Sequence, residues 1–175
     1  ERQGRDGDED ERATGERTHG GSPSDDPESR VGCPKGPTRR RARGVALQAL
    51  YELDCTSHKA DEVLARLVYD EEVDEETYEF VATLVRGVIG HRREIDAVIA
   101  QHAPAFPVDQ MAVVDRNVLR IALFELLYTD DTPLKVAINE AVELAKLFGA
   151  DSTPRLVNGV LGAVADGEDE SRDTP

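Results

Sequence analysis

Four closely spaced arginines are the residues in this sequence best suited to bind a nucleic acid. The chain as a whole is acidic, with a formal net charge of −15 at pH 7. Guanidinium groups make paired hydrogen bonds with phosphate and stack on bases. Cations at the start of a helix face the positive end of its dipole, so these arginines do not help the helix to form. We therefore expect an RNA or DNA strand to contact them; they are Arg39, Arg40, Arg41 and Arg43.

The helix that begins at these arginines predicts further contacts on one face. At about 100° per residue, one face carries polar and aromatic side chains opposite the apolar stripe. Arginine for phosphate, glycine for close approach, an amide for base edges and a ring for stacking suit single-stranded RNA. The alternative is a solvated face on which the tyrosine covers the edge of the core. The residues are Arg40, Gly44, Gln48 and Tyr51.

Motifs for catalysis or for metal binding are missing from the sequence. The four histidines are dispersed, and no glycine-rich nucleotide-binding loop occurs. Cys33 and Cys55 are too isolated to form a zinc site. An acidic run at 70–76 is interpreted as an exposed loop followed by a helix start. We expect no catalytic residues, no metal site and no cofactor.

The apolar period between residues 38 and 165 is helical throughout, without strand-like alternation. It predicts an all-α fold of seven helices that pack as two small bundles. The fifth helix is expected from about Val108 to Tyr128. Threonine-proline pairs at 132 and 153 predict the starts of the last two helices. Arg120 falls close to the apolar side of the fifth helix, which predicts a buried cation paired with a carboxylate.

Both ends of the chain differ from its centre. Residues 1–37 lack aromatic side chains, and residues 166–175 are polar and acidic, so both are expected to be disordered. Each end has a net charge of −4, which leaves −7 for residues 38–165. That acidity argues against a general nucleic-acid coat and favours a local site or one shared with a basic partner. The absence of an apolar leader and of long apolar runs predicts a cytoplasmic protein without membrane contact.

Three segments together resemble the NusB family of bacterial transcription antitermination factors. The resemblance spans nearly all of 38–165 and implies an N-terminal bundle of three helices at 38–90 and a C-terminal bundle of four at 91–165. It also implies binding of boxA RNA from ribosomal RNA operons, as a heterodimer with the ribosomal protein NusE, within the transcription elongation complex. The segments are RRRARGVALQALYELD at 39–54, VDRNVLRIALFELLY at 114–128 and VAINEAVELAKLFGADSTPRLVNGVLGAV at 136–164.

The resemblance assigns roles to individual residues. The four arginines match the family's arginine-rich RNA-binding motif, and Gln48 and Tyr51 match positions on the same helix. A second RNA contact surface is implied around 148–158, with Phe148, Ser152 and Arg155 as its contributors. Asp115 matches an acidic or polar position on the side that meets NusE.

Three features depart from the family pattern. They are the long acidic N-terminal extension, Leu156 where some members have an aromatic ring, and Phe106 where relatives often have tryptophan.

Two other functions stay open from the sequence. One is a stand-alone ribosome-assembly factor that uses the same surfaces. The other is the RNA-binding part of an RNA cytosine methyltransferase, although the sequence has no Pro-Cys nucleophile motif.

Overall fold

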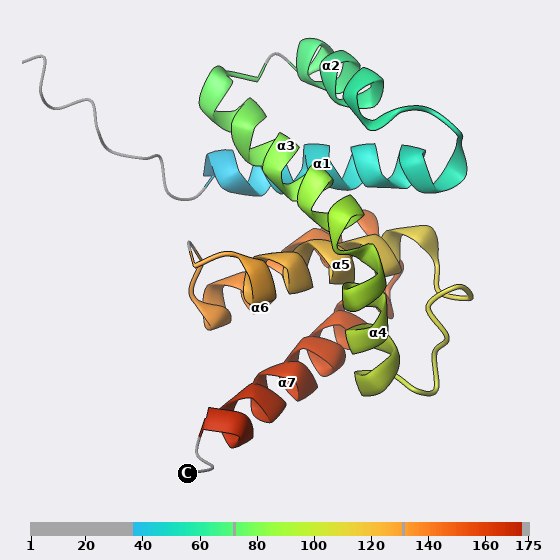
Figure 1. Cartoon of the computed structure of the whole chain (residues 1–175), viewed down its shortest axis with the longest axis vertical. Coiled ribbons are helices and arrows are strands. Elements are labelled where there is room, and N and C mark those ends of the chain that lie inside the picture. The colour runs from blue at the N-terminus through green and yellow to red at the C-terminus, as the bar shows by residue number, and fades with distance from the viewer. Residues whose placement is uncertain (1–36, 72, 131, 173–175) are drawn as a thin grey trace, which may run out of the picture. The chain divides into compact units, whose positions relative to one another are not determined.

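The computed structural model describes residues 37–71, 73–130 and 132–172, which form seven α-helices and no strand (Figure 1). The predicted all-α fold is therefore confirmed. The predicted disordered extension lies outside the described residues, apart from residue 37, and so does Cys33. The helices are α1 (Pro37–Cys55), α2 (Ala60–Asp70), α3 (Glu75–Gly90), α4 (Arg92–His102), α5 (Val113–Tyr128), α6 (Leu134–Phe148) and α7 (Thr153–Arg172).

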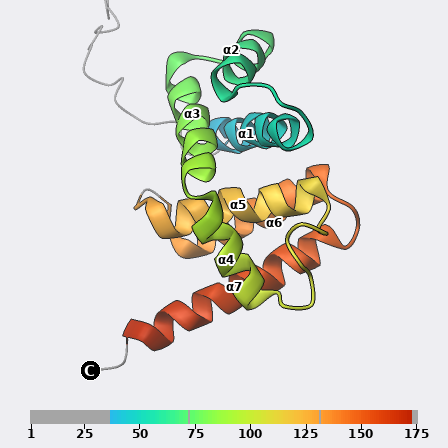
Figure 2. The ribbon, with the colours of Figure 1, turned by 45° about the vertical axis from the view of Figure 1, so that its right-hand side comes forward.

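Helix α1, which carries the arginines, is held on several sides. It packs against α2, α3, α5 and α6, and it lies between α2 and α5 (Figures 1 and 2). Its inward stripe consists largely of small residues, of which Ala42, Ala46 and Ala49 are almost fully buried. Small side chains let the neighbouring helices approach closely. The start of α1 is thereby fixed beside α6.

Helix α5 is the centre of the fold, because it packs against α1, α3, α4, α6 and α7. Its residues 117–125 are buried without interruption, so the helix has no solvent-facing side over this stretch. A helix that is buried all round must pair any polar residue it contains. Asn117, Arg120 and Glu125 are such residues, and each has hydrogen-bond partners. The predicted division into two bundles near residue 90 stays a prediction.

A glycine sets the distance between α3 and α5. A Cβ atom at Gly87 would lie 2.0 Å from Cζ of Phe124, so only glycine accommodates the ring. The ring of His91, at the junction of α3 and α4, stacks on Tyr128 with centroids 3.9 Å apart. These contacts join the end of α3 to the end of α5.

Three helix ends differ from the predictions. Helix α5 begins at Val113, because the amides of Gln110 and Met111 donate to the Pro107 carbonyl in a turn, and the backbone at Ala112 is not helical. The N-cap of α6 is the proline at 133, and the preceding threonine donates to Glu125 instead. Helix α7 runs on to Arg172, past the predicted boundary at 165. No proline interrupts that stretch, and extending an existing helix requires no new nucleus.

Candidate nucleic-acid interface

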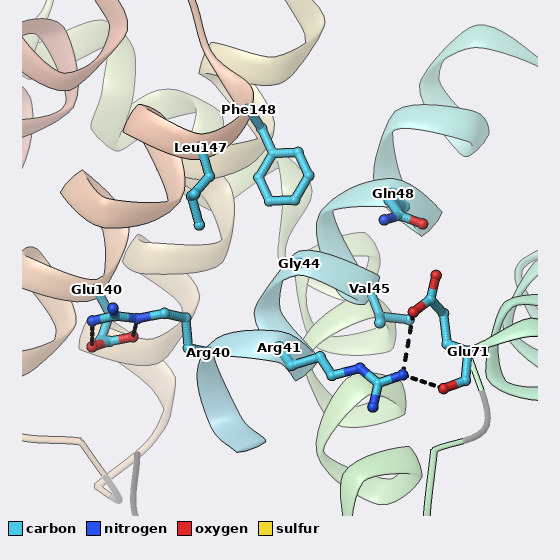
Figure 3. Close-up of a pocket in the computed structure, with 9 residues that line it drawn as sticks. All are labelled: Arg40, Arg41, Gly44, Val45, Gln48, Glu71, Glu140, Leu147 and Phe148. Atoms are coloured by element: carbon cyan, nitrogen blue, oxygen red, sulfur yellow. Dashed lines mark hydrogen bonds and ion pairs between the residues drawn. The ribbon is translucent and has the colours of Figure 1, made fainter. Parts of the chain in front are cut away.

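A pocket of about 610 Å³ opens between the start of α1 and the end of α6, and we call it the α1–α6 pocket (Figure 3). It brings together four of the predicted RNA-binding residues, Arg40, Arg41, Gln48 and Phe148. The sequence predictions had placed the first three on one helix and the last on another. Folding puts them in one site because α1 packs on α6. The other lining residues are Gly44, Val45, Glu71, Glu140 and Leu147.

The aromatic ring of the pocket lies on the backbone of α1. A Cβ atom at Gly44 would be 3.5 Å from Cζ of Phe148, an ordinary contact distance, and Gly44 itself is buried. Phe148 nevertheless leaves 43% of its surface exposed, and the adjacent Leu147 leaves 65%. The ring is thus supported from one side and still has area available to a ligand.

A second cavity of about 430 Å³ continues from the same ring. It is lined by Phe148, Gln48 and Tyr51, among other residues. The exposure of Arg40, Gln48 and Tyr51 follows the helical-wheel prediction, whereas Gly44 is covered rather than open. Phe148 and Gln48 therefore connect two neighbouring cavities along α1.

Each of the two arginines in the α1–α6 pocket is held by a glutamate. Arg40 donates from Nε and Nη2 to the two carboxylate oxygens of Glu140, at 3.1 and 2.7 Å. Arg41 donates to the backbone carbonyl of Glu71 and, at 3.4 Å, to its carboxylate. Figure 3 shows the two arginines pointing away from each other toward these partners. The two phosphate-binding candidates are therefore already paired within the protein.

The pairing of Arg40 with Glu140 shifts the titration of both groups. The hydrogen bond between them is the main reason that the pKa of Arg40 is raised above its ordinary value. The same bond lowers the pKa of Glu140, against partial burial, which acts to raise it. Glu140 is consequently ionised at neutral pH and available as a competitor for its arginine.

The structure places Arg43, predicted as an RNA-binding residue, in an environment different from that of Arg40 and Arg41, and a direct contact of Arg43 with RNA stays a prediction. Its side chain is only 4% exposed and donates to both carboxylate oxygens of Glu125, at 2.8 and 2.7 Å. A buried guanidinium of this kind links α1 to α5. Arg39 is half-buried, with its guanidinium 4.9 Å from the centroid of the Phe80 ring. Of the four arginines, Arg40 and Arg41 are thus exposed, Arg39 is half-buried and Arg43 is buried.

The predicted second RNA surface is divided by the structure. Ser152 and Arg155 do not line the α1–α6 pocket with Phe148. They line a different cavity of about 600 Å³. It lies between α7 and residues 102–115, which include the first turn of α5, and we call it the α5–α7 pocket. Its lining is mostly apolar and includes Phe106, which is more than half exposed.

Asp115, the residue predicted to meet a partner protein, also lines the α5–α7 pocket. It is half-buried and accepts a hydrogen bond of 2.7 Å from the hydroxyl of Thr153. That bond ties the first turn of α5 to the first turn of α7. Leu156 is a further lining residue, so both aromatic departures from the family pattern, at 106 and 156, fall in this cavity.

A buried ion network positions α1 against α4 and α5. Asp54, at the end of α1, accepts hydrogen bonds from Arg116 and Arg120, each at 2.8 Å, and pairs with Arg92 at 2.9 Å. Arg120 also donates to both carboxylate oxygens of Asp96. The prediction that Arg120 is a buried cation paired with a carboxylate is confirmed. Burial acts to raise the pKa of Asp54, but the hydrogen bond from Arg116 and the nearby arginine charges outweigh it and lower the pKa.

Four lining residues of the α1–α6 pocket were not predicted from the sequence, and one of them, Val45, lies on α1 itself. Glu140 and Leu147 lie on α6, and Glu71 follows α2. Glu140 precedes Phe148 by eight positions, a spacing that places the two on one helix face. That spacing could have revealed Glu140. Nothing in the sequence indicates that the end of α2 reaches Arg41.

The described part of the chain holds no group of three or more His, Cys, Asp or Glu side chains arranged to bind a metal ion. Among its helices, none combines the length and the apolar character needed to cross a membrane.

Comparison with known proteins links this geometry to one family. The family model described as the NusB family matches residues 40–166. The transcription antitermination protein NusB of Dehalococcoides mccartyi strain CBDB1 is 50% identical over 128 residues, which cover 73% of this chain and 90% of that protein. The protein of the same name from Herpetosiphon aurantiacus is 54% identical over 132 residues, covering 74% and 90%.

Solved structures of NusB proteins have a fold similar to that of this chain. A structure of T. maritima NusB matches with a TM-score of 0.68 and 33% identity, covering 73% of this chain and 90% of that one. A crystal structure of antitermination factors NusB and NusE in complex with dsRNA matches with a TM-score of 0.68 and 27% identity, covering 74% and 97%. The relatives are antitermination proteins rather than enzymes, in agreement with the prediction that this chain is not an enzyme.

Proposed function

The chain belongs to the NusB family, and we propose that it binds boxA-type single-stranded RNA of ribosomal RNA operons together with ribosomal protein NusE to support transcription antitermination. The observation that carries the RNA part is the α1–α6 pocket, which joins two exposed arginines, an amide and an exposed ring. The names of the relatives support the antitermination role. The similar crystal structure that holds NusB, NusE and dsRNA supports the choice of partners.

Four residues of the α1–α6 pocket have side chains that suit a single strand. Arg40 and Arg41 bind phosphates, and Gln48 hydrogen-bonds to the edge of a base. Phe148 stacks on a base, which is the usual way in which proteins hold unpaired nucleotides. The two arginines form a small basic site on a protein whose net charge is −15. Binding is therefore local rather than spread over the surface.

The path of the strand over the protein surface follows from the two connected cavities. Phe148 and Gln48 line both, and Tyr51 lines the second. A strand that enters at Arg40 therefore passes over Phe148 and continues toward Tyr51. Ser152 and Arg155 line a separate cavity, so a strand that contacts them continues beyond the first pocket.

The α5–α7 pocket is the proposed docking surface for NusE, and an RNA strand that contacts Ser152 and Arg155 shares this surface with NusE. It combines an apolar lining with the carboxylate of Asp115, and Phe106 gives it an exposed ring. Apolar area with a large ring is typical of the centre of protein interfaces. The acidity of this chain complements a basic ribosomal protein.

RNA binding with and without purified NusE tests the proposal. A boxA-like strand should bind more tightly than a scrambled strand of equal length, and NusE should tighten the boxA-like strand further. Replacing Arg40 and Arg41 by alanine should weaken binding and reduce the slope of log K against log salt by about 0.7 per lost single-strand contact. Unchanged affinity of that variant at matched salt would refute the proposed site.

An assay of transcription separates this role from ribosome assembly, which would use the same surfaces. Purified elongation complexes with a boxA-containing transcript should read through a terminator more often when the chain and NusE are both added. RNA binding without any change in read-through would favour the assembly role.

A further inference from the structure

We infer that Glu140 is a positioning residue that attenuates RNA binding, because it holds Arg40 in the RNA-free protein and a phosphate must displace its carboxylate. The inference rests on the RNA-binding function proposed above. It concerns a residue that the sequence did not single out and that lies on α6, apart from the arginine cluster itself.

The contact between Glu140 and Arg40 occupies the donors that a phosphate would need. Arg40 uses Nε and Nη2 to reach the two oxygens of Glu140 at 3.1 and 2.7 Å. Phosphate oxygens accept from the same fork of donors in the same bidentate geometry. Carboxylate and phosphate therefore compete for one guanidinium. The Arg40 side chain is 43% exposed, so a strand can reach it from solvent.

Glu140 has a second partner that remains when Arg40 leaves. Nη1 of Arg43 lies 3.5 Å from Glu140 Oε2, and Arg43 is itself fixed by its paired bonds to Glu125. Release of Arg40 thus does not leave Glu140 as an isolated buried charge, which would be strongly unfavourable. Arg43 takes part in RNA binding in this indirect way.

The other arginine of the pocket is held differently. Arg41 donates to the backbone carbonyl of Glu71, and its distance to the Glu71 carboxylate is 3.4 Å. A backbone carbonyl carries no net charge, so its competition with phosphate is weaker than that of a carboxylate. Glu140 is therefore the main internal competitor in the pocket.

The effect of such competition is the same for every strand that takes Arg40. Each one gives up the internal ion pair, so all affinities fall by a common factor. A partly exposed ion pair corresponds to about a two- to fivefold effect on affinity. At a given RNA concentration, the bound fraction of strands that make only phosphate contacts then becomes small. A strand that also stacks on Phe148 has a higher affinity and remains bound.

The test uses Glu140→Gln in the full chain with NusE present. The amide keeps the shape of the side chain but removes its charge. Fluorescence anisotropy at low salt should show that boxA-like and scrambled strands both bind about two- to fivefold more tightly. The gain should shrink as salt rises, because salt also screens the exposed pair in the wild type. In an Arg40→Ala background, Glu140→Gln should produce no gain.

Glu143→Gln is the matched control. It removes the same charge from the same helix, and Glu143 contributes to the field at Arg40, but its carboxylate pairs with Lys146 at 2.7 Å. We expect a smaller gain from this variant than from Glu140→Gln. An equal gain would mean that net charge alone is responsible and would overturn the inference, as would a gain from Glu140→Gln that persists in the Arg40→Ala background.

The remaining outcomes separate this inference from the proposed function. If Arg40→Ala weakens RNA binding and Glu140→Gln changes nothing, the RNA site stands and the role of Glu140 is overturned. If Arg40→Ala binds RNA as the wild type does, both fail. The Nε–H resonance of Arg40 in the wild type gives a reading without any substitution at 140. It should shift on titration with RNA, and a constant resonance at saturation would overturn the displacement step.

Discussion

Phe148 is the residue at which the proposed stacking can be tested most directly. The change is Phe148→Leu, which removes the ring and keeps an apolar side chain on the backbone of α1 at Gly44. Stacking of one base on an aromatic side chain contributes about 1–3 kcal/mol. Its loss should weaken binding of a boxA-like strand about 5- to 150-fold. Because 43% of the side chain is exposed, the substitution should reduce the free energy of unfolding by less than about 1.5 kcal/mol.

The assay is fluorescence anisotropy with a labelled boxA-like strand and NusE at fixed salt, accompanied by thermal unfolding of each variant. Phe148→Tyr retains the ring and should bind within about twofold of the wild type, since stacking depends on the π-face. Leu147→Ala is the matched control. Leu147 lines the same pocket and is more exposed, at 65%, but offers no ring.

Two results would refute the stacking argument. One is an equal loss of affinity for Phe148→Leu and Leu147→Ala, which would mean that apolar contact alone is needed. The other is unchanged affinity for Phe148→Leu in a protein that is folded and whose unfolding temperature is preserved.

Two further predictions concern how the fold holds the site. Gly87→Ala should lower the free energy of unfolding in urea by up to about 2 kcal/mol, because overpacking against Phe124 costs about 1–3 kcal/mol and helix propensity returns only about 1. Gly90→Ala, where a Cβ atom meets nothing within 4 Å, should not destabilise, and equal losses at both positions would contradict the packing explanation. Asp54→Asn should lower stability at pH 7 by about 3 kcal/mol, since it removes the carboxylate from a buried arginine network. The pKa of Asp54 is depressed below its ordinary 3.8, so this contribution is complete well above that pH and is lost as pH falls below it; a difference from the wild type that does not shrink in acid would contradict the assignment.

The helices and the exposed face of α1 could be predicted because they depend on local periodicity. The stripe of Ala42, Ala46 and Ala49 is buried, and Arg40, Gln48 and Tyr51 are exposed, as the spacing indicates. Arg120 could be predicted for the same reason, because a cation close to the apolar side of a central helix must find a carboxylate.

The environments of the other site residues depend on tertiary packing and could not be predicted. Arg43 belongs to the same basic cluster as Arg40, yet it is buried because Glu125 of α5 lies opposite. Ser152 follows Phe148 closely in sequence, but the chain turns between α6 and α7 and places them at different cavities. Which arginine is exposed, and which cavity a residue between α6 and α7 lines, is decided by elements far away in the sequence.

If the α1–α6 pocket binds RNA as proposed, the charges that line it explain how an acidic protein selects one strand. Arg40 and Arg41 are matched by Glu140 and Glu71, so the lining carries as many carboxylates as guanidinium groups. A phosphate therefore gains little from net attraction and must exchange places with a carboxylate. Binding of a strand then depends on what it gains besides phosphate contacts, and the ring of Phe148 and the amide of Gln48 are the groups in the pocket that offer such gains. On the proposed function, the arginines fix the position of the strand, and the neighbouring uncharged side chains determine which strand stays bound.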